Sequence, residues 1–281
     1  MKNDPEGVVL LYFSSLLFLL SVILGFMNWN TRRQIIYAVA VSVLAIASFL
    51  YIFRDTFFPT PTCFDKKQNG YESGIDCGGT CSLRCNDQVT PLSVKWSKSI
   101  LSAPSTYDLV ALVSNKNIDN ASRALGYSFL IYNEKGSIIA NVTGTTTAPV
   151  DGDFPIIKQS VRLPEAPKEV VLQLNDTSHF IVSEKPTSPT LITANTYFEN
   201  GSIPRVYSTI INTKRVTISN LPVRAVLYDT NNNVFAVGET IIPFLDKEES
   251  KNISFTWDFP LTQAPVVINI YPIFDPFSAV Q

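Results

Sequence analysis

The sequence predicts a mainly β protein with an N-terminal two-helix transmembrane hairpin, a small disulfide-rich collar and two tandem β-sandwiches. Three observations predict this architecture: two uncharged apolar segments near the start, four cysteines in one short Gly-rich stretch, and alternating apolar runs with turn residues between them in the rest of the chain. We therefore divide the chain into the hairpin at 8–53, the collar at 61–87 and the sandwiches at 92–178 and 191–275.

The hairpin consists of two predicted helices, residues 8–28 and 35–53. About 20 apolar residues in a helix span the hydrocarbon core of a bilayer, and both segments have this length. Arg32 and Arg33 are the only charges within residues 8–53, and they lie in the predicted turn between the helices. A cleaved signal peptide is the alternative for the first segment. Acidic residues precede this segment and no small-residue cleavage site follows it, which disfavours that alternative.

The collar holds every cysteine of the chain. An even number of cysteines in a segment with little apolar content favours two disulfides in place of a hydrophobic core, and three pairings remain open. A zinc site with four thiolates is the alternative, but one cysteine stands apart from the other three, unlike the close pairs of such sites. Disulfides require an oxidising compartment, so we expect an integral protein of the cytoplasmic membrane with extracytoplasmic C-terminal domains. The cysteines are Cys63, Cys77, Cys81 and Cys85.

Oxygen-bearing side chains are spaced regularly through the same segment. Calcium takes six to eight oxygen ligands, so this spacing suggests a structural Ca²⁺ site. The register of an EF-hand loop is absent. The alternative is that these side chains accept hydrogen bonds from their own backbone in Asx-turns. The candidate ligands are Asp65, Asn69, Glu72 and Asp76.

The collar pattern C-x-D-x3-N-G-x-E-x-G-x-D-C-G-G-x-C resembles a short module of bacterial surface proteins, found near membrane anchors or between extracellular domains. The resemblance implies an extracytoplasmic, calcium-binding and disulfide-linked collar on a bacterial envelope. The matching positions are Cys63, Asp65, Asn69, Gly70, Glu72, Gly74, Asp76, Cys77, Gly78, Gly79 and Cys81.

The β region contains an internal repeat. Residues 127–142 align with residues 223–238, and the same spacing places Pro164 on Pro260. This repeat indicates that one sandwich has been duplicated, with the Pro-containing segment 183–189 as the connector. Period-2 alternation predicts that one side-chain set faces the core. These core residues are Phe129, Ile131, Ala225 and Leu227.

The central strand of each copy carries a short F-x-L-Y-D-like pattern, FLIYN at 129–133 and AVLYD at 225–229. Both resemble FxLYD domains, which are immunoglobulin-like sandwiches of bacterial envelope proteins. The first copy departs from the pattern at Ile131 and Asn133, and the second at Ala225. The resemblance implies an immunoglobulin-like fold for each copy.

The sequence carries no catalytic set. It has one histidine, no nucleophile elbow and no phosphate-binding loop, so we expect that it is not an enzyme. A net charge of −2 gives no reason to expect nucleic acid. We predict a membrane-anchored extracytoplasmic structural or adhesive protein that presents two β-sandwich binding modules, with the lipid bilayer and an external protein or glycan as partners. The alternative is an accessory subunit of an envelope-spanning secretion or pilus-like assembly.

Overall fold

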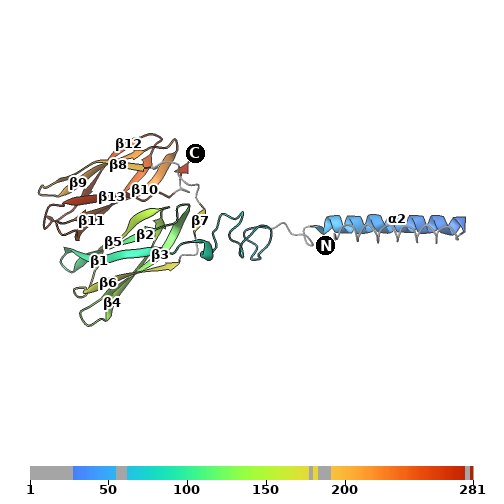
Figure 1. Ribbon diagram of the computed structural model, residues 1–281, viewed down its shortest axis with the longest axis horizontal. Helices are drawn as coiled ribbons and strands as arrows, with labels where there is room; N and C mark the ends of the chain where they lie inside the picture. The colour runs from blue at the N-terminus through green and yellow to red at the C-terminus, as the bar shows by residue number, and fades with distance from the viewer. Residues whose placement is uncertain (1–27, 55–61, 177–179, 183–190, 276–278, 281) are drawn as a thin grey trace, which may run out of the picture. The chain divides into compact units, whose positions relative to one another are not determined.

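The computed structural model (Figure 1) describes residues 28–54, 62–176, 180–182, 191–275 and 279–280. The chain divides into two compact units, Met1–Pro61 and Thr62–Gln281. In the described residues the first unit is one helix, and the second consists of the collar and antiparallel strands. The predicted connector at 183–189 lies outside the described residues.

Helix α2 (Trp29–Ile52) is apolar on every side from Ile35 onward, and none of its residues is buried. At about 1.5 Å per residue its 24 residues are long enough to cross a bilayer. The length and apolar composition of the helix fit a membrane span, and a signal sequence near an N-terminus has the same two properties.

The helix begins earlier than the sequence predicted. The expected turn before residue 35 is helical from Trp29, so that prediction is wrong. No Gly or Pro interrupts this stretch, and the guanidinium of Arg33 lies 5.0 Å from the ring centroid of Trp29 one turn earlier. One apolar helix is therefore described where two were predicted. The first predicted helix, residues 8–28, lies outside the described residues except for Asn28.

The first repeat forms two antiparallel sheets. One has the strand order β1-β2-β5, and the other has the order β4-β3-β6 with the short β7 also paired to β3. The strand pairings of both sheets are antiparallel, and this strand content confirms the mainly β prediction. The strands are β1 (Ser93–Ala103), β2 (Thr106–Asn115), β3 (Asn120–Tyr132), β4 (Ile138–Ala148), β5 (Gly152–Arg162), β6 (Glu169–Asp176) and β7 (Ile181–Val182).

The second repeat follows the same plan strand for strand. Its sheets have the orders β8-β9-β12 and β11-β10-β13, and β14 pairs with β10 as β7 pairs with β3. This correspondence agrees with the duplication that the sequence indicates. The strands are β8 (Leu191–Glu199), β9 (Arg205–Asn212), β10 (Thr217–Tyr228), β11 (Val234–Leu245), β12 (Ser250–Thr256), β13 (Val267–Pro272) and β14 (Ala279–Val280).

Equivalent asparagines fix the loops of both repeats. In the first, Nδ2 of Asn115 donates to the carbonyl oxygens of Asn120 (3.1 Å) and Pro149 (2.6 Å). In the second, Nδ2 of Asn212 donates to those of Val216 (2.8 Å) and Asp246 (2.9 Å). Both asparagines are buried, and buried amides need such partners. The two repeats therefore share these loop contacts as well as their strand order.

Each repeat has a hydrophobic cluster to which both of its sheets contribute. In the first repeat the cluster joins Leu109 of β2 and Phe154 of β5 to residues of β3 and β6. In the second it joins Val206 and Phe255 to residues of β10 and β11. The predicted core residues are fully buried in these clusters, which confirms their placement; they are Phe129, Ile131, Ala225 and Leu227.

A third cluster, here called the seam, joins the two repeats within the second unit. Val110 and Ile157 come from the first repeat and pack with residues of β10 and β11. Ile273, which follows β13, is 2% exposed and belongs to the cluster of the first repeat. The second-repeat members of the seam are Val226, Tyr228, Val234 and Val237.

One buried charge crosses the seam. Arg224 of β10 is 7% exposed. Its Nη1 donates to the carbonyl oxygen of Pro155 (2.6 Å), and its Nη2 donates to Oγ1 of Thr146 (3.2 Å), both in the first repeat. Its Nε donates to Oε2 of Glu239 on the neighbouring strand (2.6 Å). These bonds supply partners for a charge that would otherwise be costly to bury.

Candidate functional site

The collar contains two disulfides, as the sequence predicted. Cys63 is bonded to Cys81 and Cys77 is bonded to Cys85, so the structure selects one of the three possible pairings. No cysteine is free. The second disulfide starts inside the loop closed by the first and ends outside it. This interleaved pairing restrains the collar without a large apolar core.

The Asp76 carboxylate holds the start of the collar. Its Oδ1 accepts hydrogen bonds from the backbone N–H groups of Asp65 (2.9 Å) and Lys66 (3.0 Å), and its Oδ2 also accepts from Lys66 (3.0 Å). Lys66 and Asp76 both have a positive φ, +61° and +55°. The carboxylate thus replaces the regular backbone bonds that these turns lack.

The other three candidate ligands form a short chain of hydrogen bonds. Oδ2 of Asp65 accepts from Nδ2 of Asn69 (2.7 Å), and Oε2 of Glu72 accepts from the backbone N–H of Asn69 (3.2 Å). Oδ1 of Asp65 accepts from the backbone N–H of Lys67 (2.9 Å), which is an Asx-turn contact. The hydrogen bond from Asn69 holds the pKa of Asp65 below its ordinary value.

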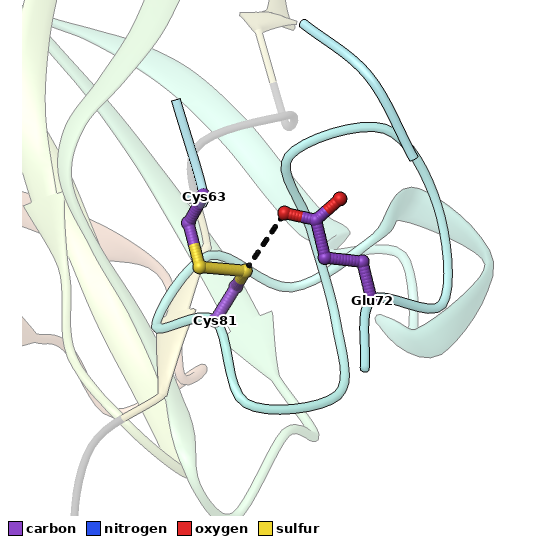
Figure 2. A group of neighbouring side chains, drawn as sticks. All are labelled: Cys63, Glu72 and Cys81. Atoms are coloured by element: carbon purple, nitrogen blue, oxygen red, sulfur yellow. Dashed lines mark hydrogen bonds between the residues drawn. A yellow bond between two sulfur atoms is a disulfide. The ribbon is translucent and has the colours of Figure 1, made fainter. Parts of the chain in front are cut away.

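These carboxylates do not converge as a trio. Among the described residues, one group of three Cys, His, Asp or Glu ligand atoms lies within 4.8 Å, namely Cys63, Glu72 and Cys81 (Figure 2). Sγ of Cys81 lies 3.4 Å from Oε1 of Glu72. This sulfur is part of the disulfide, so it has no proton to donate and offers no thiolate to a metal.

One oxygen in the collar is without a hydrogen-bond partner. Oδ1 of Asn69 is the buried side-chain polar atom of the described residues that accepts no hydrogen bond. A buried acceptor of this kind normally has a partner. The side-chain oxygen atoms of the collar are the type of ligand that a hard cation prefers. In this structure the carboxylates of Asp65, Glu72 and Asp76 accept hydrogen bonds from the backbone.

The collar is joined to the first repeat by strand-like contacts. The backbone N–H of Arg84 donates to the carbonyl oxygen of Phe180 (2.9 Å), and that of Val182 donates to Ser82 (2.8 Å). Leu83 and Ile181 form an isolated antiparallel bridge. Sequence analysis missed this docking. The signal for it was Leu83, an apolar residue between two collar cysteines, together with the apolar run at 180–182.

Polar side chains reinforce the same contact. The Arg84 guanidinium donates to Oδ1 of Asn120 (3.1 Å) and pairs with Asp119 (3.2 Å). Beyond the collar, Asn117 is buried and exchanges two hydrogen bonds of 2.8 Å with the backbone of Thr90. The collar is therefore fixed to the β region rather than merely linked to it.

The comparisons with known proteins identify no family. No family model matches the chain, and no curated protein matches it. A transglutaminase of red sea bream is among the solved structures that match, with 11% identity over 66% of this chain and a TM-score of 0.20. The match covers 29% of the transglutaminase chain. A likeness at this level carries no argument about function.

Proposed function

We propose that this chain is a membrane-anchored extracytoplasmic protein in which the collar and two immunoglobulin-like sandwiches form a structural or adhesive module. The observation that carries the proposal is the pair of disulfides in the segment that follows α2. Disulfides persist on the oxidising side of a membrane. The segment after the helix therefore belongs outside the cytoplasm.

Charge does not orient α2 by itself, because Arg32 and Arg33 lie in its first turns while Arg54, Lys66 and Lys67 follow its other end. The disulfides decide the orientation we propose, in which the C-terminal end of the helix faces outward. The two sheets of each repeat share one cluster, which supports a sandwich for each.

A second candidate function is an accessory subunit of an envelope-spanning assembly. Small residues at exposed positions of α2 support it, because they allow another transmembrane helix to approach closely. Ala38, Ser42 and Ala45 are such residues. Crosslinking from Ser42 in intact membranes distinguishes the two candidates: a membrane-embedded partner favours the assembly.

Thiol labelling tests the orientation. After reduction of intact cells with a membrane-impermeant reductant, we expect a membrane-impermeant maleimide to label the collar cysteines. As a control, Thr31→Cys in a background with all four native cysteines changed to Ser should be labelled only after the membrane is disrupted. If the native collar cysteines need disruption as well, the proposed orientation is wrong.

Calcium binding at the collar is a further part of the proposal, supported by the buried, unpartnered Oδ1 of Asn69. Asn69 would hold the ion together with the carboxylates of Asp65 and Glu72, which both bond to Asn69. We expect calorimetry on the whole chain in detergent to give a Kd of about 10⁻⁴–10⁻³ M, typical of extracellular modules.

Two variants locate the calcium site. Asn69→Ala should abolish the binding heat, whereas Asn86→Ala, in the short 3-10 helix Asn86–Gln88, should leave it unchanged. Absence of binding heat at millimolar calcium, or equal binding by the Asn69→Ala protein, would show that the collar is a disulfide-linked spacer only.

A further inference from the structure

A cleft of about 420 Å³ lies along the seam, with walls from both repeats. We propose that this cleft binds a neutral carbohydrate. The inference rests on the proposed extracytoplasmic location, where such ligands are exposed on cell surfaces, and it names a ligand class for the adhesive function. The residues that line the cleft are Trp96, Lys98, Leu112, Asp153, Tyr228, Asn232, Val234, Asn269 and Tyr271.

The aromatic part of the lining suits the C–H face of a sugar ring. Trp96 of β1 and Tyr228 of β10 meet edge to face with ring centroids 6.5 Å apart, one from each repeat. Tyr271 of β13 lies against the same cluster, and the buried Leu112 and Val234 complete the apolar surface. Tyr and Trp combine a large apolar surface with a polar edge, so they bind ligands of mixed character.

The polar part of the lining offers both donors and acceptors. Nδ2 of Asn269 donates to the hydroxyl of Tyr271 (3.3 Å), and Asn269 also hydrogen-bonds with Tyr228, which leaves the amide oxygen as an acceptor. Asn232 adds a second amide at the rim. Burial raises the pKa of Tyr228 to about 12, and hydrogen bonds with Tyr271 and Asn269 tie its hydroxyl to the same polar group. Vicinal sugar hydroxyls need this mixture of donors and acceptors.

The charges of the cleft favour neither a cation nor an anion. Asp153 is paired with Lys95 at 2.5 Å. Lys98 donates to Oδ1 of Asn233 at 3.3 Å. The lining itself holds one carboxylate, Asp153, and one ammonium group, Lys98, so the formal charge of its residues is zero. A ligand rich in hydroxyl groups and without charge fits this balance.

The cleft is formed in advance of binding, because both of its walls are fixed. The seam cluster packs β2 and β5 against β10 and β11, and Arg224 ties β10 to Pro155 of β5. A preformed site avoids the entropic cost of ordering its walls on binding. Its volume lies within the range of about 300–1,000 Å³ that is typical of ligand sites.

The test uses the whole chain in a detergent without a sugar headgroup. The probes are the methyl glycosides of glucose, galactose, mannose and N-acetylglucosamine, with glucuronic acid and glucosamine as charged comparisons. Saturation-transfer NMR identifies binders, and titration gives their affinity. We expect at least one neutral glycoside to bind and the charged sugars to bind more weakly.

Two variants assign the binding to the cleft. Asn269→Ala and Asp153→Asn should each weaken it about tenfold, the equivalent of roughly one lost hydrogen bond. The matched control is Asn252→Ala on β12, whose amide bonds to Thr209 and lies outside the cleft. The control should bind like the parent.

Three results overturn the proposal: no neutral glycoside binds at millimolar concentration, a charged sugar binds best, or the cleft variants bind as tightly as the control. None of these results bears on membrane orientation, which thiol labelling measures separately. Failure of the labelling prediction would in turn leave the binding measurement valid.

Discussion

Arg224→Ala is expected to lower the free energy of unfolding of the β region by about 3–5 kcal/mol, the usual cost of removing one partner from a buried charged network. The guanidinium makes hydrogen bonds to Pro155 and Thr146 across the seam and to Glu239 beside it. The substitution leaves a buried carbonyl oxygen without this donor and a space where the side chain lay.

The matched control for this prediction is Arg215→Ala. Arg215 also faces a glutamate, Glu248, at 3.4 Å, but their side chains are 89% and 65% exposed. Exposed pairs contribute about 0–1 kcal/mol, since water and salt screen them. Urea unfolding of the whole chain in detergent measures both variants. Equal stability of the two would show that the hydrogen bonds of Arg224 do not stabilise the β region.

Gly79→Ala is expected to prevent the collar from folding. We expect it to lower the free energy of unfolding by more than about 4 kcal/mol, which few single substitutions do. Gly79 has a φ of +59°, and a Cβ added there would lie 1.6 Å from the carbonyl oxygen of Tyr71. That atom belongs to the backbone, so no rotation of a side chain relieves the clash. Gly79 and Tyr71 both lie inside the loop closed by the Cys63–Cys81 disulfide, so the clash opposes closure of that loop.

Refolding from the reduced state measures the effect of Gly79→Ala. We expect the parent to regain the Cys63–Cys81 and Cys77–Cys85 bonds by mass-spectrometric mapping, and the variant to give mixed pairings. Gly136→Ala is the control: its φ is +73°, but no atom lies within 4 Å of the added Cβ. Gly136→Ala should lower the stability by only about 1–2 kcal/mol, because alanine is less stable than glycine in a left-handed backbone conformation. Native disulfide pairing in both variants would contradict the prediction.

The candidate site was predictable in its chemistry but not in its geometry. The four cysteines and the carboxylates of the collar were found from composition and spacing. The pairing was not, because closure entropy grows only slowly with loop length and so does not select among the three pairings. Nor did the sequence show that Asp76 holds backbone N–H groups while Asn69 leaves a buried oxygen unpaired. Those roles depend on the path of the chain between the two disulfides.

The sequence alone determined the features that arise from local pattern: the mainly β content, the apolar helix, the disulfides, the repeat, and the burial of Phe129 and Leu227. Alternation assigns a side chain to one face of a strand but does not say what covers that face. The seam was therefore decided by tertiary structure. Its signal was the unbroken apolar run at 109–113, typical of a strand covered on both faces. Arg224 looks solvent-facing by the same alternation, and only the packing of the first repeat against β10 buries it.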